Sequence, residues 1–123
     1  MGSRPSYGTV VGLSTEGTLF LEGFELHVDH NGDSAVVRVG GEIDLTSAPQ
    51  LDEGLQELVN GPVRHLTLDL SGVSFMDSTG LRILLKTSKV LEGSGGKLDL
   101  REPSDPVRRL LEVSGLGSHF ELN

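Results

Sequence analysis

The chain contains 123 residues, no cysteine, and 18 acidic against 10 basic side chains, which gives a formal net charge of −8. A chain of this length folds as one domain around a single core, and without cysteine it forms no disulfide. Its acidic balance, with no basic patch to offset it, argues against nucleic acid or a membrane surface as partner. The apolar runs are too short to cross a bilayer and the N-terminus lacks a secretory signal pattern, so we expect a cytoplasmic protein.

The first 22 residues differ in composition from the rest of the chain. They are rich in Gly, Ser and Thr, and their few apolar residues follow no sustained period. A segment of this kind buries little apolar surface of its own. We therefore expect 1–22 to be a weakly ordered N-terminal extension and 23–123 to be the folded domain.

The folded domain is predicted to begin with a β-hairpin. Apolar and polar residues alternate over 24–29, as in a strand with one buried face. Turn residues follow at 31–33, and the mostly β-branched run 35–39 then ends at Gly40-Gly41. These features predict two antiparallel strands joined by a tight turn.

Helices and strands are predicted to alternate in the rest of the chain. Apolar residues recur at helical spacing in three segments, 48–59, 78–92 and 105–113. The order β-β-α-β-α-β-α-β predicts an α/β fold, a mixed sheet of four to five strands with helices packed on it. The remaining strands are predicted at 66–70, 97–100 and 120–122.

The segment Asp69–Leu81 combines polar and apolar residues in the pattern with the clearest chemistry. It is predicted to run from a strand through a loop at 71–75 into a helix, with Asp77, Ser78 and Thr79 at the helix N-terminus. Free N–H groups and the helix dipole stabilise anions at such a position, and they could hold a phosphate on Ser78. The residues alone are also consistent with ordinary helix capping by Asp77 and Ser78.

The pattern Asp-x-Ser-x-Val-x-x-Met-Asp-Ser-Thr-Gly-Leu over 69–81 resembles the signature of STAS-domain anti-sigma factor antagonists. The upstream Gly41-Glu42-Ile43-Asp44 matches a second motif of that family, and the resemblance covers about 24–122. It implies a single STAS-like domain in which Ser78 is phosphorylated by an anti-sigma factor that is an ATP-dependent serine kinase. It also implies a partner-binding surface formed by Asp44, Asp77, Ser78, Thr79 and Gly80.

The resemblance implies a regulatory cycle. In that family the unphosphorylated antagonist binds the anti-sigma factor and releases the sigma factor, whereas the phosphorylated form does not bind and is reset by a phosphatase. We therefore expect an anti-sigma factor antagonist that phosphorylation of Ser78 switches off. ATP and Mg²⁺ belong to the kinase, and no cofactor is expected in this chain. The alternative is a STAS scaffold or accessory subunit of a stress-signalling complex or transporter.

Two features depart from the resembled family. Its members usually continue into a final helix after the last strand, but this chain ends at Asn123, so we expect that helix to be absent. The chain also carries the extra segment 1–22. Both departures bear on stability and dimerisation more than on Ser78, and they leave the oligomeric state open.

Metal sites and enzyme active sites find less support in the residues. The four histidines, at 27, 30, 65 and 119, lack the spacing of metal ligands on a shared face. Ser78 beside Asp77 lacks the Ser-to-His arrangement that activates a serine nucleophile, and the sequence contains no Gly-x-Ser-x-Gly motif. We therefore expect neither a bound metal nor an enzyme.

Overall fold

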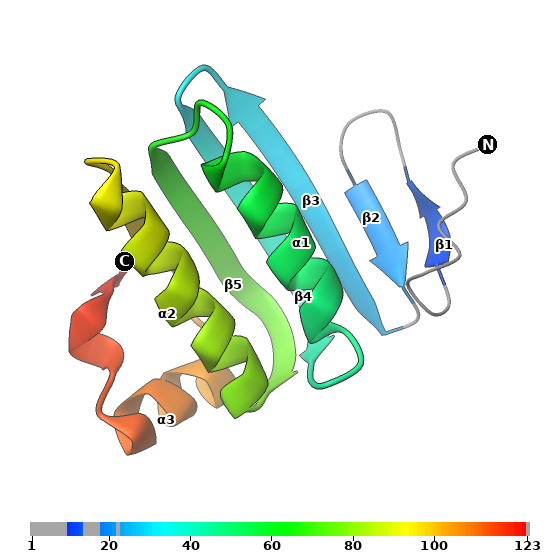
Figure 1. The fold of residues 1–123 in the computed structure, drawn as a ribbon. Coiled ribbons are helices and arrows are strands. Elements are labelled where there is room, and N and C mark those ends of the chain that lie inside the picture. Colours follow the sequence, from blue (N-terminus) through cyan, green and yellow to red (C-terminus); the bar gives the residue numbers. More distant parts are fainter. Residues whose placement is uncertain (1–9, 14–17, 22, 123) are drawn as a thin grey trace.

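Seven strands of the described residues form one mixed sheet that carries the helices (Figure 1). The computed structural model describes residues 10–13, 18–21 and 23–122. Pairing is antiparallel from the first strand to the fourth and parallel from the fourth to the seventh. The predicted α/β class with a mixed sheet is therefore confirmed. The strands lie in chain order: β1 Val10–Leu13, β2 Thr18–Leu21, β3 Phe24–Asn31, β4 Ser34–Ile43, β5 His65–Met76, β6 Lys97–Arg101 and β7 Glu121–Leu122.

The change from antiparallel to parallel pairing follows from the connections between strands. β3 and β4 are joined by a tight turn in which Gly32 has a φ of +64°, a conformation that glycine adopts without steric cost. Each parallel pair is instead joined by a crossover that contains a helix. The predicted hairpin is confirmed, and the carboxyl ends of β4 and β5 lie at the same edge of the sheet.

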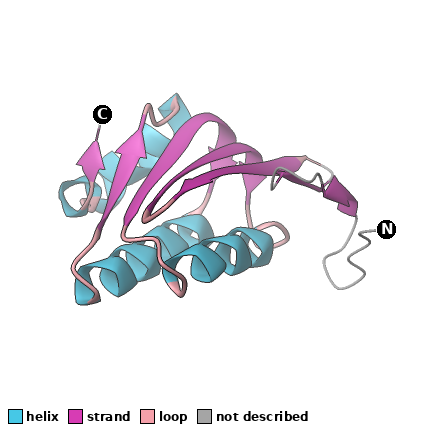
Figure 2. Ribbon diagram, turned by 90° about the horizontal axis from the view of Figure 1, so that it is seen from above, coloured by secondary structure: helices cyan, strands magenta, loops and turns pink. Residues whose placement is uncertain are grey.

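Two helices lie side by side on one face of the sheet. The helices are α1 Ala48–Val59, α2 Ser78–Gly93 and α3 Asp105–Ser114, and a 3-10 turn, Gly117–His119, follows α3. α1 and α2 contact each other, and both begin at the lower edge of the sheet in Figure 1. α3 packs against β5 and lies on the other side of the strands from this pair (Figure 2). The helix bounds agree with the predicted segments to within one residue.

Alternate residues of the central strands and one stripe of each helix form the core. In β5, Leu66, Leu68 and Leu70 are buried, while the residues between them are half-buried. Burial of a large aliphatic side chain contributes about 1.5–3 kcal/mol, so the core fixes α1 and α2 on the sheet and sets where α2 begins. The two helices add the buried side chains of Leu51, Leu55, Leu84 and Leu91.

Two strands lie within the segment that was predicted to be a weakly ordered extension. β1 and β2 pair with each other, and β2 pairs with β3 through the register Leu21 to Phe24. The predicted domain itself contributes five strands, within the expected four to five, and β1 and β2 add two. Strands this short contain too few residues to show a period, and their pairing uses backbone groups that every sequence offers. The rest of the segment 1–22 lies outside the described residues.

Strand β5 is longer than predicted. It extends over His65–Met76 and includes the whole of the predicted loop at 71–75. The apolar alternation stops at Leu70, and two register shifts interrupt the pairing with β4 beyond that point. An irregular pairing of this kind has no period in the sequence. β4 likewise continues beyond its predicted end at Gly40-Gly41 to Ile43, and the same irregular pairing explains why the sequence pattern did not predict this extension.

Candidate functional site

The predicted site residues meet at the edge of the sheet where β4 and β5 end. Ile43 is the last residue of β4 and pairs with Met76, the last residue of β5. One residue further along, the Asp77 N–H donates a hydrogen bond of 3.3 Å to the Ile43 carbonyl oxygen. Asp44 and Asp77 therefore leave neighbouring strands at the same level, beside the first turn of α2.

Asp77 is the N-cap of α2. Its Oδ1 accepts hydrogen bonds from the Thr79 N–H at 2.9 Å and from the Thr79 hydroxyl at 2.5 Å. The Thr79 hydroxyl is the main cause that lowers the pKa of Asp77 below its ordinary value; desolvation opposes the shift and backbone N–H groups reinforce it. Asp77 is therefore a carboxylate at neutral pH, placed at the positive end of the helix dipole.

Ser78 is the first residue of α2, and its side chain is exposed. Among the described residues, none forms a hydrogen bond with its hydroxyl. Thr79, by contrast, is half-buried, and its hydroxyl is engaged with Asp77. Capping of α2 therefore belongs to Asp77 and not to Ser78, which leaves the Ser78 hydroxyl accessible.

Most N–H groups at the start of α2 already have acceptors within the protein, and the expectation that these groups hold a phosphate on Ser78 stays a prediction. The Asp77 side chain accepts from the N–H of Thr79, and the Asp77 carbonyl oxygen accepts from the N–H groups of Gly80 and Leu81. The N–H groups of Thr79, Gly80 and Leu81 are therefore already satisfied within the protein. A phosphate on Ser78 would also lie beside a carboxylate.

Gly80 is buried and belongs to the packing of the site rather than to its surface. A Cβ at this position would lie 2.7 Å from Ile43 Cγ2 and 2.8 Å from Met76 Cγ, closer than carbon atoms approach. The absence of a side chain lets the first turn of α2 lie directly on the ends of β4 and β5. Its predicted place in a partner-binding surface therefore becomes an indirect one, through the position of Ser78.

Asp44 is the first residue of the β4–α1 loop, which comprises residues 44–47, and its side chain forms hydrogen bonds within that loop. Its Oδ1 accepts hydrogen bonds from the N–H groups of Thr46 at 2.9 Å and Ser47 at 3.2 Å. Ser47 lies at the N-cap position of α1, but its hydroxyl donates to the Glu42 carbonyl oxygen at 2.6 Å and does not cap the helix. Asp44 is half-buried, and it shapes the loop as well as bordering the site.

Sequence reasoning missed two large apolar side chains near the site. Leu45, in the β4–α1 loop, is 77% exposed, and Phe75, near the end of β5, is 46% exposed. Leu45 directly follows Asp44, and Phe75 lies two residues before Asp77. The only signal for them in the sequence is their type, apolar residues beside polar motif residues and outside any amphipathic period. They make this edge of the molecule partly apolar.

A cleft of about 330 Å³ opens between the N-terminal halves of α1 and α2. Thr79 belongs to its lining, so the cleft begins next to Ser78. Sequence periodicity places apolar residues on helix faces but does not show where two helices leave a hollow. The lining residues are Leu45, Ala48, Pro49, Asp52, Thr79, Arg82, Ile83 and Lys86.

Metal and membrane features can be stated for the described part of the chain. Residues 10–13, 18–21 and 23–122 contain no group of three or more His, Asp or Glu side chains placed to hold a metal ion. Within the same ranges, no helix is both long enough and apolar enough to cross a membrane. The side chains at this edge of the sheet include two carboxylates, hydroxyls and exposed apolar groups, a set suited to protein recognition and modification.

Comparison with known proteins places this chain in a family. The family model described as "Mlab, STAS domain" matches residues 26–122. This range includes every strand and helix from β4 to β7, and both ends of the site at Asp44 and Ser78. The chain therefore belongs to the STAS domain family.

Its relatives and structural neighbours carry names that agree with one another. An anti-sigma-F factor antagonist, RsfB of Mycobacterium tuberculosis (strain CDC 1551 / Oshkosh), is 40% identical over 94 residues, 76% of this chain and 75% of that protein. An anti-sigma-B factor antagonist of Staphylococcus aureus (strain NCTC 8325 / PS 47) is 37% identical over 87 residues, 71% of this chain and 81% of that protein.

A solved structure shares the fold at similar coverage. The anti-sigma factor antagonist SpoIIAA in its unphosphorylated form superposes with a TM-score of 0.71 and 27% identity, and covers 80% of this chain and 87% of that one. The phosphorylated form of SpoIIAA from Bacillus gives a TM-score of 0.65 at 26% identity, over 80% of this chain and 90% of that one. These proteins are regulators named for their action on anti-sigma factors.

Proposed function

We propose that this chain is an anti-sigma factor antagonist that binds an anti-sigma factor with serine kinase activity and is switched off by phosphorylation of Ser78. The observation that carries the proposal is the state of Ser78: an exposed hydroxyl without a hydrogen-bond partner among the described residues, at the first position of α2. The names of the relatives, and the existence of phosphorylated and unphosphorylated forms of SpoIIAA, support the same function. They favour it over a scaffold or a transporter subunit.

The switch is electrostatic in this proposal. Phosphorylation adds a charge of about −1.5 to −2 at neutral pH. The new charge lies beside the Asp77 carboxylate, whose pKa is lowered by the Thr79 hydroxyl and which therefore stays ionised. Since Asp77 already accepts from the N–H groups of Thr79 and Gly80, these two donors are not free to offset the charge of the phosphate. A partner surface that fits the neutral serine then meets a concentration of negative charge.

A small energetic difference is enough for this switch. A change of about 1.4 kcal/mol in binding free energy shifts the affinity tenfold. Burying a doubly charged phosphate beside a carboxylate at a partner interface costs more than that. The cycle takes place in the bacterial cytoplasm, with ATP and Mg²⁺ held by the kinase and with a phosphatase that restores Ser78.

Phosphorylation of the purified chain tests the proposal. Incubation with the anti-sigma factor kinase of the same organism and MgATP is expected to add one phosphate, seen by intact mass and mapped to Ser78 by peptide sequencing. The variant Ser78→Ala is expected to bind the anti-sigma factor and to remain bound when ATP is added. Thr79→Val, which removes the neighbouring hydroxyl, is the matched control and is expected to be phosphorylated. A phosphate mapped to another residue, or normal release of Ser78→Ala, contradicts the proposal.

A further inference from the structure

The cleft between α1 and α2 has an apolar floor and an exposed apolar rim. Ala48 and Ile83 are buried beneath it, Pro49 adds a third apolar side chain, and Leu45 stands at its edge with 77% of its surface exposed. Single exposed leucines are common on protein surfaces. Leu45, however, lies on the edge of an apolar hollow of about 330 Å³. A partner side chain that enters this hollow removes water from the leucine and from the floor of the hollow at the same time, which favours binding.

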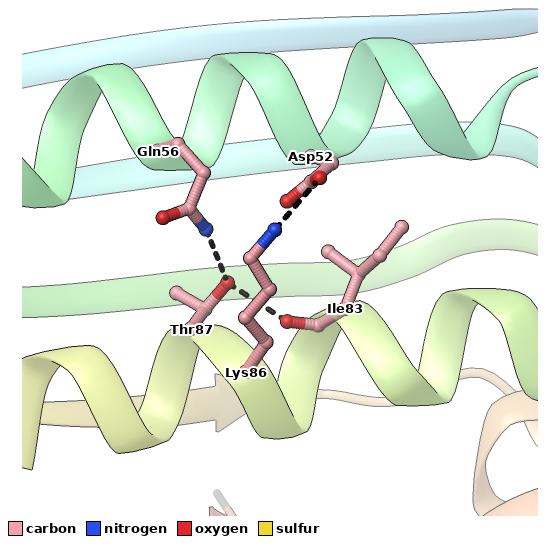
Figure 3. A network of polar contacts seen from close by, with 5 residues as sticks. All are labelled: Asp52, Gln56, Ile83, Lys86 and Thr87. Carbon is pink, nitrogen blue, oxygen red and sulfur yellow. Dashed lines mark hydrogen bonds and ion pairs between the residues drawn. The ribbon is translucent and has the colours of Figure 1, made fainter.

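The charged side chains at the cleft leave one cation without a partner. Lys86 Nζ lies 3.0 Å from Asp52 Oδ2, so these two charges balance each other across the helices (Figure 3). Arg82 is exposed and forms no hydrogen bond or ion pair within the described residues. The uncompensated charge at the cleft is therefore positive, although the protein as a whole carries −8. A guanidinium group binds a carboxylate through two parallel hydrogen bonds.

Polar contacts between the helices hold the inner end of the cleft. The buried Thr87 donates its hydroxyl to the Ile83 carbonyl oxygen at 2.8 Å and accepts from Gln56 Nε2 at 3.5 Å (Figure 3). The Asp52–Lys86 ion pair connects α1 and α2 at the cleft itself, and the Gln56–Thr87 contact connects them about one turn beyond it. A cleft held in this way exists before a partner arrives, which lowers the entropic cost of binding.

We propose that this cleft is a docking groove for a segment of the anti-sigma factor that places an apolar side chain on the floor and a carboxylate on Arg82. The inference rests on the proposed function and identifies the surface and the partner chemistry that it uses. Charge complementarity selects the occupant: an acidic and apolar segment matches the free guanidinium and the apolar floor, whereas a basic segment is repelled by Arg82.

The position of Arg82 also connects the groove to the switch. Arg82 is four residues after Ser78 on α2, so the two side chains lie on the same face of the helix. Side chains of a helix lean toward its N-terminus, so a guanidinium at position 82 is within reach of the turn that carries Ser78. A phosphate on Ser78 then competes with the partner's carboxylate for the same cation.

Binding measurements on the unphosphorylated full-length chain test the groove. The probe is the purified anti-sigma factor kinase that phosphorylates the wild-type chain, and the affinity is measured by isothermal titration calorimetry. Arg82→Glu is expected to weaken binding about tenfold or more, and Leu45→Ser about fivefold. Arg109→Glu is the matched control, because it makes the same charge change at an exposed position on α3, and it is expected to bind within twofold of wild type.

The outcomes separate this inference from the proposed function. If the wild-type chain fails to bind the kinase, or binds it equally well after phosphorylation, the proposed function is wrong. If the wild-type chain binds and is released by phosphorylation, but Arg82→Glu binds within twofold of it, only the docking groove is overturned. Light scattering of the same variants tests whether a second copy of this chain occupies the groove instead. A variant that changes the oligomeric state without changing the kinase affinity identifies the groove as an interface between copies, and this result also overturns the proposal.

Discussion

The β4–α1 and β5–α2 connections leave the same edge of the sheet but are built differently. The first is a loop, 44–47, in which the Asp44 carboxylate accepts from two backbone N–H groups and the loop exposes Leu45. The second has no loop: β5 ends at Met76, Asp77 caps the helix, and Ser78 is already its first residue. In both, an aspartate side chain satisfies the backbone, and the residue directly after it is presented to solvent.

This comparison separates a structural role from a functional one within each connection. The aspartates hold the backbone, and the exposed neighbours, an apolar side chain in one case and a hydroxyl in the other, are left for a partner. A loop can offer a large apolar residue because its backbone does not have to continue a helix. A helix start offers a small polar residue at a fixed position and orientation, which suits a modification site.

The largest expected effect concerns Gly80, whose close packing on the strand ends belongs to the β5–α2 connection and has no counterpart in the β4–α1 loop. Gly80→Val places a side chain within 2.8 Å of Ile43 Cγ2 and Met76 Cγ, so α2 must shift from the sheet. We expect a loss of about 1–3 kcal/mol in the free energy of unfolding, measured by urea denaturation. Gly93→Val, at the other end of the same helix with no atom near its Cβ, is the control and is expected to show no such loss. Equal stability of the two variants would refute this packing role.

The next effect concerns the cap of α2. Asp77→Ala removes the acceptor of two Thr79 hydrogen bonds and is expected to cost about 0.5–2 kcal/mol of unfolding free energy. Ser104→Ala is the control, because Ser104 is the N-cap residue of α3 but makes no side-chain cap hydrogen bond. Thermal unfolding of both variants checks the difference, and a loss of the same size for Ser104→Ala would rule out a specific capping role for Asp77.

The Asp77 contribution also has a defined pH dependence. The Thr79 hydroxyl lowers the pKa of Asp77 in the folded protein from its ordinary value of 3.8, so the folded state favours the ionised form. The stabilisation is therefore present in full above the unfolded-state pKa and is lost as the pH falls through the lower, folded-state value. The stability difference between wild type and Asp77→Ala should shrink as denaturation is measured at pH values falling below about 4. A difference that stays constant over this range would contradict the charge-based account.

Sequence patterns predicted the elements in which apolar residues recur at a regular spacing, and they missed the elements that have no such spacing. The helices over 48–59, 78–92 and 105–113 were predicted correctly because a helix face repeats its apolar residues. The irregular half of β5 and the short strands β1 and β2 have no such repetition, since their pairing depends on backbone groups and register shifts. The position of the site followed from the fold, because parallel strands end at one edge.

The division of roles within the site needed the structure. Asp77 and Ser78 are both common capping residues, and the choice between them depends on which side chain points back at the Thr79 N–H. The exposure of Leu45 and the lack of a partner for Arg82 among the described residues are properties of the tertiary arrangement. Neither property belongs to a single residue or its neighbours in the chain, so no local pattern shows it.

The smallest expected effect concerns Asp44 in the β4–α1 loop, which the resemblance places in the partner-binding surface. Asp44 is half-buried and accepts from the N–H groups of Thr46 and Ser47, so Asp44→Ala leaves these donors without their acceptor. We expect a loss of about 0.5–1.5 kcal/mol in unfolding free energy, because solvent can replace part of these exposed hydrogen bonds. Asp44→Asn keeps an acceptor oxygen in the same place and is expected to recover most of that stability.

The same pair of variants shows whether the Asp44 charge has a further role in the partner surface. Stability is measured by urea denaturation and affinity by calorimetry with the anti-sigma factor kinase. If Asp44→Asn recovers both, the aspartate acts through the shape of the loop that presents Leu45. If Asp44→Asn recovers stability but binds as weakly as Asp44→Ala, the Asp44 carboxylate itself contacts the partner. The β4–α1 loop then places its aspartate at the interface, whereas the β5–α2 connection uses its aspartate to cap the helix.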